Sequence, residues 1–400
     1  MKILQVNKFF YLRGGTERYL FTLSELLKKH GVEVIYFSQK NPKNFPSTEE
    51  KYFLSDLELG GFSWPTLLKL PRIFYSFEAK RKIKKIIVEQ KPDLVHLHNI
   101  YHQISPSILP VIKKANLPLV MTVHDFKLIK PDYTLRADHK KIRPKNSRLV
   151  QALLATEFYW QKIRRVYEKN IDLFIVPSEF VKNQLIINGF AAQKIVVIPH
   201  PAGLNNFIVQ PSQLEKYLFS FGRLDESKGL KTLIEAFALL TANNNYPDLQ
   251  LKIAGTGPQE PELLKLAADY QLTERIKFLG QQDKAKLAEL ISGSLAVIVP
   301  SLVHETFGLA ILESFINGKA VIASRVGALG EIIQVEENGL LFEAGNKNDL
   351  KDKINWLLNN PDKLAAMNLK AQVTALKYDP EKHFQQINQI YHKLIEKNEN

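Results

Sequence analysis

Two acidic side chains, Glu305 and Glu313, flank the start of a predicted helix in the second half of the chain. The helix is expected at residues 309–317, after a buried strand at 295–300, and Gly318 suits its left-handed end. Eight positions separate the acids, a little over two helical turns, so both can face one side. The first N–H groups of a helix bind anions, whereas ionised acids accept hydrogen bonds from sugar hydroxyls. The segment therefore predicts a site for a ligand that joins a sugar, phosphates and a nucleoside.

A second loop supplies positive charge. Residues 222–229 read Gly-Arg-Leu-Asp-Glu-Ser-Lys-Gly and join a strand that begins at Tyr217 to a helix expected from Leu230. Arg223 offers a planar fork of donors and Lys228 a point charge, the two forms in which proteins present cations to phosphate. Because ligands of parallel sheets lie beyond the carboxyl ends of strands, this loop predicts a diphosphate contact.

Two more candidates lie in the first half of the chain. Gly14 and Gly15 stand between a strand at residues 1–6 and a helix at 17–30, where glycine permits either close backbone approach to a ligand or a plain tight turn. The loop lacks the G-x-G-x-x-G pattern, so no nicotinamide site is expected. His124, followed by Asp125, ends a strand expected at 119–123. A neutral imidazole both donates and accepts, so His124 is either a substrate contact or a structural histidine.

Three further histidines surround the strand expected at residues 93–97. His96 and His98 are two positions apart and share one face of that strand, and His102 follows in the next loop. Carboxylates are sparse nearby in the sequence. We therefore expect no metal at these histidines.

Length and composition restrict the class of protein. Four hundred residues, 45% hydrophobic and 24% charged, predict two globular domains. The chain has no cysteine, which excludes disulfides, thiolate metal ligands and cysteine nucleophiles. The chain opens with a strand instead of a signal peptide, and no apolar run approaches the roughly 20 residues of a membrane span. These features predict a cytoplasmic location.

Positive charge is concentrated in the first half. Residues 1–200 carry 33 Lys and Arg against 17 Asp and Glu, whereas residues 201–400 carry 21 against 24. A basic half indicates an anionic partner, either a phosphorylated acceptor or an acidic membrane face. Nucleic acid is the weakest option because no known reading module is present. The basic helix expected at 72–90 is either solvated or a peripheral contact with anionic lipid on the inner face of the plasma membrane.

Strands and helices alternate along the whole chain, which predicts an α/β fold of two Rossmann-like, doubly wound parallel sheets. Residues 202–215 lack periodicity and are interpreted as the connection between domains. The predicted division is 1–201 for the first domain, 202–377 for the second, and 378–400 for a last helix after the break at Tyr378-Asp379-Pro380.

These motifs resemble a known family. Glu305 and Glu313, with Phe307-Gly308-Leu309 between them, resemble the signature of the retaining glycosyltransferases of family 4 (glycosyl transferases group 1), which have the GT-B fold. The loop 222–229 is similar to their diphosphate-binding loop. The resemblance covers nearly the whole chain, with the motifs in the right order. Many relatives place cysteines after the His-Asp pair, where this chain has Lys130-Pro131, so any thiol role is absent.

The resemblance implies specific roles. Two domains face a cleft, the first binding the acceptor and the second the sugar nucleotide, and the last helix returns to the first domain. Arg223 and Lys228 neutralise the leaving diphosphate, Glu305 orients the sugar and His124 touches it, and these four are the expected catalytic residues. The implied donor-binding residues are Gly14, Gly15, Gly222, Gly255, Phe307, Gly308, Leu309 and Glu313, the last through the ribose. Because the two cations do the work of a metal, neither a metal nor another cofactor is expected.

The expected reaction is transfer of a sugar from a UDP- or GDP-sugar to a saccharide or lipid-linked acceptor, in cell-envelope polysaccharide biosynthesis. Two alternatives remain at this point: a GT-B sugar-nucleotide epimerase, which needs no acceptor, and a non-catalytic sugar-nucleotide-binding protein. The sequence leaves the sugar, the base and the acceptor open. Acceptor choice is assigned to the loops at residues 40–70 and 127–148.

Overall fold

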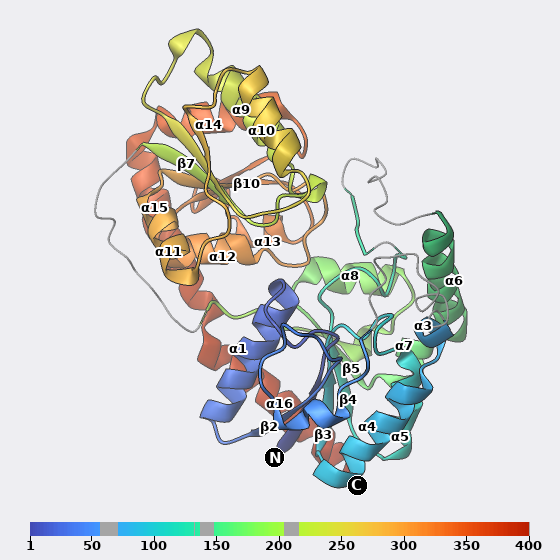
Figure 1. Ribbon diagram of the computed structural model, residues 1–400. Coiled ribbons are helices and arrows are strands. Elements are labelled where there is room, and N and C mark those ends of the chain that lie inside the picture. The colour runs from blue at the N-terminus through green and yellow to red at the C-terminus, as the bar shows by residue number, and fades with distance from the viewer. Residues whose placement is uncertain (57–70, 132, 137–147, 204–215, 400) are drawn as a thin grey trace. The chain divides into compact units, whose positions relative to one another are not determined.

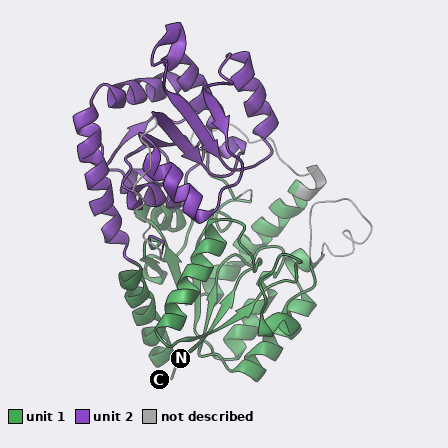
Figure 2. Ribbon diagram, turned by 60° about the vertical axis from the view of Figure 1, so that its left-hand side comes forward, with its two compact units in different colours: residues 1–134, 144–201, 380–400 green, residues 135–143, 202–379 purple. Residues whose placement is uncertain are grey.

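The computed structural model of the chain describes residues 1–56, 71–131, 133–136, 148–203 and 216–399 (Figure 1). The chain divides into two compact units, coloured separately in Figure 2. Unit 1 comprises residues 1–134, 144–201 and 380–400, and unit 2 comprises residues 135–143 and 202–379. Most of the connection at 202–215, and large parts of the loops to which acceptor choice was assigned, lie outside the described residues.

Unit 1 is built on a six-stranded parallel sheet with the strand order β2-β1-β3-β4-β5-β6. Its strands are β1 (Lys2–Val6), β2 (Glu33–Phe37), β3 (Leu94–Leu97), β4 (Leu119–Thr122), β5 (Leu173–Val176) and β6 (Ile195–Val197). Parallel neighbours need crossover connections, which helices supply. The helices are α1 (Gly15–Lys29), α3 (Pro71–Phe74), α4 (Phe77–Gln90), α5 (Leu109–Lys114), α6 (Arg148–Arg164), α7 (Val166–Asn170), α8 (Glu179–Ile187) and α16 (Pro380–Glu399).

The last helix, α16, belongs to the core of unit 1. Its residues Phe384, Ile387 and Tyr391 are buried in one cluster with side chains of α1 and of the sheet. The ring of His30, at the end of α1, stacks on Phe384 with 3.9 Å between ring centroids. The predicted return of this helix to the first half of the chain is thereby confirmed, and the red helix lies beside blue α1 in Figure 1.

Unit 2 repeats the architecture with the strand order β12-β11-β10-β7-β8-β9. Its strands are β7 (Tyr217–Phe221), β8 (Gln250–Ala254), β9 (Ile276–Phe278), β10 (Ala296–Val299), β11 (Val321–Ser324) and β12 (Gly339–Phe342). Its helices are α9 (Leu230–Thr241), α10 (Glu260–Asp269), α11 (Lys284–Gly293), α12 (Leu309–Ile316), α13 (Leu329–Ile332), α14 (Lys347–Leu358) and α15 (Pro361–Ala375). Separate apolar clusters cover the two faces of the sheet, as parallel sheets require.

Each sheet has a point where the strand order reverses. In unit 1 the point lies between β1 and β3, and in unit 2 between β7 and β10. The crossovers on either side of such a point leave in opposite directions, so the loops at the carboxyl ends of these strands part and leave room for a ligand.

The described residues also form short 3₁₀ helices. These are η1 (Thr48–Tyr52), η2 (Pro106–Ile108), η3 (Ala192–Lys194), η4 (Glu226–Lys228), η5 (Ala242–Asn244) and η6 (Leu376–Tyr378).

Two predicted helices are each divided in the structure. The helix expected at 72–90 is α3 followed by α4, because the buried Ser76 caps α4 by accepting a hydrogen bond from the N–H of Ala79 at 3.1 Å. The sequence also predicts a helix at 150–169, and the structure has α6 followed by α7 there. Arg165, between them, has a left-handed backbone with φ of 51°, which a continuous helix does not allow.

The observed unit boundaries can be compared with those expected from the sequence. The first boundary lies between residues 201 and 202 in both. The second lies after Asp379, two residues later than expected, because η6 still belongs to unit 2. Leu135 and Arg136 also group with unit 2 instead of unit 1. Among the residues described, no helix is long and apolar enough to cross a membrane.

Candidate active site

The loops after β7 and β10 both begin at the switch point of unit 2, and a side chain of each contacts the other there. These strands are direct parallel neighbours, with Ala296 opposite Leu218 (Figure 1). The loop after β7 carries Arg223 and Lys228, and the loop after β10 carries Glu305. Residues that are 77 positions apart in the sequence are thereby brought to one edge of the sheet.

Lys228 and Glu305 form an ion pair in which the Nζ atom of Lys228 lies 2.6 Å from Oε1 of Glu305. The hydroxyl of Ser301 donates a second hydrogen bond to the same oxygen at 2.8 Å. Burial alone would lower the pKa of Lys228, but the Glu305 carboxylate outweighs it and raises that pKa. Burial would likewise raise the pKa of Glu305, and Lys228 outweighs it and lowers that pKa. Both side chains are therefore charged at neutral pH.

Arg223 is linked to this pair through Asp225. Its Nε lies 3.3 Å from Oδ2 of Asp225, and its side chain is 59% exposed. Asp225 also caps the turn η4 by accepting a hydrogen bond from the N–H of Ser227 at 3.1 Å. The capped turn fixes the loop, so one exposed guanidinium and one partly exposed ammonium stand together at the strand end.

Gly222 and Gly255 lie at the ends of the neighbouring strands β7 and β8. The N–H of Gly222 donates to the carbonyl of Ala254 at 3.0 Å. Gly255 has φ of +132°, and a Cβ atom there would lie only 1.8 Å from the carbonyl oxygen of Gly222. Only glycine fits the backbone at position 255. Because Gly222 and Gly255 have no side chains, the backbone next to Arg223 is left uncovered by them at this edge of the sheet.

The start of α12 contains the remaining candidates of unit 2. Gly308 is its N-cap, with φ of +118°, and Leu309 is its first residue. The side chain of Phe307 is 4% exposed and packs on Tyr378, with 5.7 Å between ring centroids, so only its backbone can meet a ligand. Glu313 lies on α12 and is partly exposed. The structure thus pairs Lys228 with Glu305 and places Glu313 on the helix that follows.

Arg136 is a site residue that sequence reasoning missed. Its guanidinium lies 3.0 Å from Oε1 of Glu226, in the same loop as Arg223 and Lys228, and its side chain is only 8% exposed. The carbonyl of Leu135 accepts a hydrogen bond from the N–H of His304, next to Glu305, at 2.6 Å. No motif around Arg136 predicts these contacts, because Glu226 and His304 are far from it in the sequence.

The candidates of unit 1 lie at the carboxyl edge of its own sheet. Gly14 is the N-cap of α1 and Gly15 its first residue. His124 follows β4, is partly exposed, and its Nε2 lies 2.9 Å from Nδ1 of His98. Burial lowers the pKa of His124 to about 3, so its imidazole is neutral. His96 and His98 stack with 4.5 Å between centroids, which confirms that they share a face.

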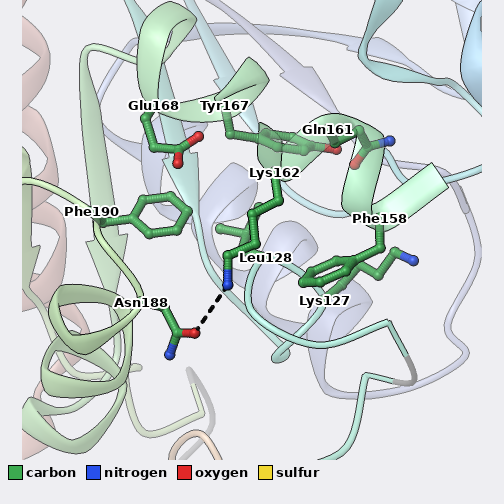
Figure 3. A pocket seen from close by; sticks show the side chains of 9 residues that line it. All are labelled: Lys127, Leu128, Phe158, Gln161, Lys162, Tyr167, Glu168, Asn188 and Phe190. Atoms are coloured by element: carbon green, nitrogen blue, oxygen red, sulfur yellow. Dashed lines mark hydrogen bonds between the residues drawn. The ribbon is translucent and has the colours of Figure 1, made fainter. Parts of the chain in front are cut away.

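A surface hollow of unit 1 lies among α6, α7, α8 and the segment after β4 (Figure 3). The Nζ atom of Lys162 points across it to Oδ1 of Asn188 at 3.5 Å. The hollow is lined by Lys127, Leu128, Phe158, Gln161, Lys162, Tyr167, Glu168, Asn188 and Phe190. None of the residues predicted for the site is among them. In the described part of the chain, no three His, Cys, Asp or Glu side chains are grouped as they would be to hold a metal ion.

Comparison with known proteins gives matches to both halves of the chain. The family model described as Glycosyltransferase Family 4 matches residues 13–204, and that described as Glycosyl transferases group 1 matches residues 205–374. The chain is 25% identical over 389 residues to phosphatidyl-myo-inositol mannosyltransferase from Mycolicibacterium smegmatis, covering 96% of this chain and 91% of that protein.

Two solved structures share the fold. Sucrose-phosphate synthase from Thermosynechococcus elongatus gives a TM-score of 0.76 at 22% identity and covers 98% of each chain. HepE from Anabaena in complex with UDP gives a TM-score of 0.69 at 20% identity, over 98% of this chain and 100% of that one. With the two parallel sheets described above, these similarities confirm the predicted GT-B fold class.

Proposed function

Because this chain belongs to the family 4 glycosyltransferases (glycosyl transferases group 1), we propose that it transfers a sugar from a UDP- or GDP-sugar to a saccharide or lipid-linked acceptor. The proposed donor site is the switch point of unit 2. The observation that supports this most is the contact of 2.6 Å between Lys228 and Glu305, which combines a cation for phosphate with a carboxylate for sugar hydroxyls.

The proposed catalytic step is departure of the nucleoside diphosphate. Its negative charge grows as the bond to the sugar breaks, and preorganised cations stabilise that charge in the transition state. Lys228 and Arg223 are the cations proposed to bind the diphosphate, and both lie on a loop that Asp225 caps. Glu305 is held in place by Ser301 and can accept hydrogen bonds from the sugar. No metal or other cofactor is invoked.

The proposed stereochemical outcome is retention, with the acceptor attacking the face from which the diphosphate leaves. The leaving phosphate then takes the proton of the acceptor hydroxyl, so no protein nucleophile is required. The roles proposed for His124, Gly14 and Gly15 of unit 1 are contacts with the donor, His124 to its sugar and the two glycines to its diphosphate.

An anionic acceptor is proposed for unit 1. The first half of the chain carries the whole excess of positive charge, which favours acidic partners. The mannosyltransferase noted above acts, by its name, on a phosphatidyl-inositol. The basic residues of α4 are exposed and suit a peripheral contact with anionic lipid, at the inner face of the plasma membrane during synthesis of a cell-envelope polysaccharide; these residues are Lys80, Arg81, Lys84 and Lys85.

The test is a panel of sugar nucleotides, screened first by thermal shift and then for turnover. A ligand bound only by the native chain raises its melting temperature. The donor identified in this way should release its nucleoside diphosphate only when cell-extract acceptors are present, and a glycoside should form. Exchange at the sugar without a glycoside would indicate an epimerase, and tight binding without any turnover would indicate a non-catalytic binding protein. Either result would refute the proposed transfer.

A further inference from the structure

The loop after β11 lies against the backbone of Glu305. Because β11 is the parallel neighbour of β10, the loops that follow these two strands begin at the same edge of the sheet in unit 2. The N–H of Ala328 donates a hydrogen bond to the carbonyl of Glu305 at 3.0 Å. At Gly327 φ is +54°, and a Cβ atom there would lie 2.4 Å from the same carbonyl oxygen. Only glycine allows so close an approach, so the position of Glu305 depends on this neighbouring loop.

His304, the residue before Glu305, connects the same two loops through its side chain. The backbone N–H of Gly327 donates a hydrogen bond to Nδ1 of His304 at 2.7 Å. A backbone N–H can only donate, so Nδ1 accepts with its lone pair and carries no proton. The imidazole is therefore neutral, with its single proton on Nε2. The contact joins the backbone of one loop to the residue next to the candidate carboxylate in the other.

The carboxylate of Glu305 is held by contacts of a different kind. Lys228 and Ser301 both contact its Oε1, at 2.6 and 2.8 Å. A flexible lysine side chain can follow a carboxylate that moves, so this ion pair alone does not fix the place of Glu305. The hydrogen bonds from the loop after β11 fix the backbone that carries Glu305, and a shift of that backbone would displace the carboxylate with it.

We propose that His304 is a positioning residue for Glu305. Its Nδ1 atom holds the loop after β10 to Gly327, and this contact determines where the carboxylate of Glu305 stands. The consequence for the reaction rests on the proposed function, in which Glu305 orients the sugar of the donor. Lys228 lies on a separate loop, and the cap of that loop at Asp225 does not involve His304. Loss of the His304 contact should therefore impair the orientation of the sugar without weakening the binding of the diphosphate.

Two substitutions of His304 distinguish its two ring nitrogens. The amide oxygen of asparagine can accept at the position of Nδ1, whereas the amide of glutamine reaches only the position of Nε2. His304→Asn should therefore keep the bond from Gly327 and retain wild-type turnover of the sugar nucleotide. In His304→Gln kcat should fall about tenfold, the effect of one lost hydrogen bond. Isothermal titration calorimetry with UDP and GDP should give the same dissociation constants for both variants and the wild type.

The control is His392→Gln, at an exposed histidine of α16 in unit 1, which should match the wild type in both measurements. Equal kcat values in wild type and His304→Gln, or a loss in His304→Asn as large as that in His304→Gln, would refute the positioning role. Weaker binding of UDP or GDP in His304→Gln would also overturn it, because a general disturbance of unit 2 would then explain the lower turnover.

The tautomer has a separate test, nitrogen NMR of the imidazoles in the ¹⁵N-labelled full-length chain at neutral pH. The chain has ten histidines, so the signals of His304 are assigned by their loss in His304→Asn. A neutral ring with its proton on Nε2 is expected. A proton on Nδ1 or a charged ring in the wild type would overturn the proposal, whether or not the variants fold. If the wild type bound neither UDP nor GDP and released no nucleoside diphosphate from any sugar nucleotide, the proposed function would fail while the tautomer result stood.

Discussion

The Nζ atom of Lys228 lies 2.6 Å from Oε1 of Glu305, although the two residues follow different strands and are 77 positions apart. The two side chains carry opposite charges, and the hydroxyl of Ser301 donates a second hydrogen bond to Glu305. A diphosphate can therefore bind Lys228 in place of Glu305, because Glu305 keeps its hydrogen bond from Ser301. The arrangement keeps both side chains in place and ionised, ready for the proposed donor.

Removal of the Lys228 ammonium should affect turnover far more than folding. In Lys228→Ala the rate of nucleoside-diphosphate release should fall about 100-fold or more, the size of effect seen when one charge-stabilising group is lost from a transition state. Stability should change by about 1 kcal/mol at most, because the pair is partly exposed. The exposed Lys231, at the start of α9, provides the control Lys231→Ala, which should retain full activity. Equal losses in the two variants would contradict the assigned role.

The ion pair should persist over a wide range of pH. The folded pKa of Glu305 is lowered, so the pair stabilises the fold above the ordinary pKa of glutamate and is lost only as pH falls through the lowered value. The folded pKa of Lys228 is raised, so its contribution is complete below the ordinary pKa of lysine and is lost as pH rises through the raised value.

Turnover should accordingly show no ionisation of this pair between about pH 5 and pH 10. The profile of kcat against pH checks this, with Glu305→Gln as the comparison. That variant should have lower turnover, and the shape of its profile within this window should match the wild type. If the kcat of the wild type changed with pH near neutrality and this change were absent in Glu305→Gln, the carboxyl of Glu305 would titrate there, contrary to expectation.

Gly255→Ala should destabilise unit 2. The new Cβ would lie 1.8 Å from the carbonyl oxygen of Gly222, and the residue would keep a φ of +132°, so a cost of about 3 kcal/mol or more is expected. Thermal denaturation monitored by circular dichroism measures the change. Gly330→Ala on α13 is the control, because its Cβ would come no nearer than 4.0 Å to Leu341 and should have little effect. If the two variants melted at the same temperature, the close approach of the two loops would be disproved.

Arg136 and Glu226 should be energetically coupled. A double-mutant cycle with Arg136→Ala and Glu226→Ala should give a coupling free energy of about 1 kcal/mol, because the guanidinium is nearly buried while the carboxylate is partly exposed. The exposed pair Lys286 and Glu289 on α11, 2.9 Å apart, should give about 0.3 kcal/mol in a matched cycle. Denaturant unfolding of unit 2 provides the values. If the coupling free energy of Arg136 and Glu226 did not exceed that of Lys286 and Glu289, the contact of Arg136 would not stabilise the loop at residues 222–229.

The positions of most candidate site residues could be predicted from the sequence, because each lies in a short pattern of strand, loop and helix. The order of strand, glycine loop and helix placed Lys228 and Glu305 at strand ends, and parallel topology then required nearby strand ends to share an edge. The left-handed Gly318 at the end of α12 also agreed with expectation, with φ of 70°. The positions of the other candidates followed in the same way, but their contacts with a ligand remain predictions.

Other features depended on contacts between distant segments. The bond between His98 and His124 requires the pairing of β3 with β4, which no motif specifies. The division between α3 and α4 depends on Ser76, whose N–H donates to the hydroxyl of Ser107, 31 residues later. Phe307 was among the implied donor-binding residues, and its ring packs on Tyr378, a contact that the motif around Phe307 does not specify.

Binding of nucleoside diphosphates, measured by isothermal titration calorimetry, tests the central claim most directly. Wild-type protein should bind one of UDP and GDP, and Lys228→Ala should bind it at least tenfold more weakly, whereas the free nucleoside should bind both proteins equally. Lys231→Ala should match the wild type throughout. If Lys228→Ala bound the diphosphate as tightly as wild type, the switch point of unit 2 would not be the diphosphate site.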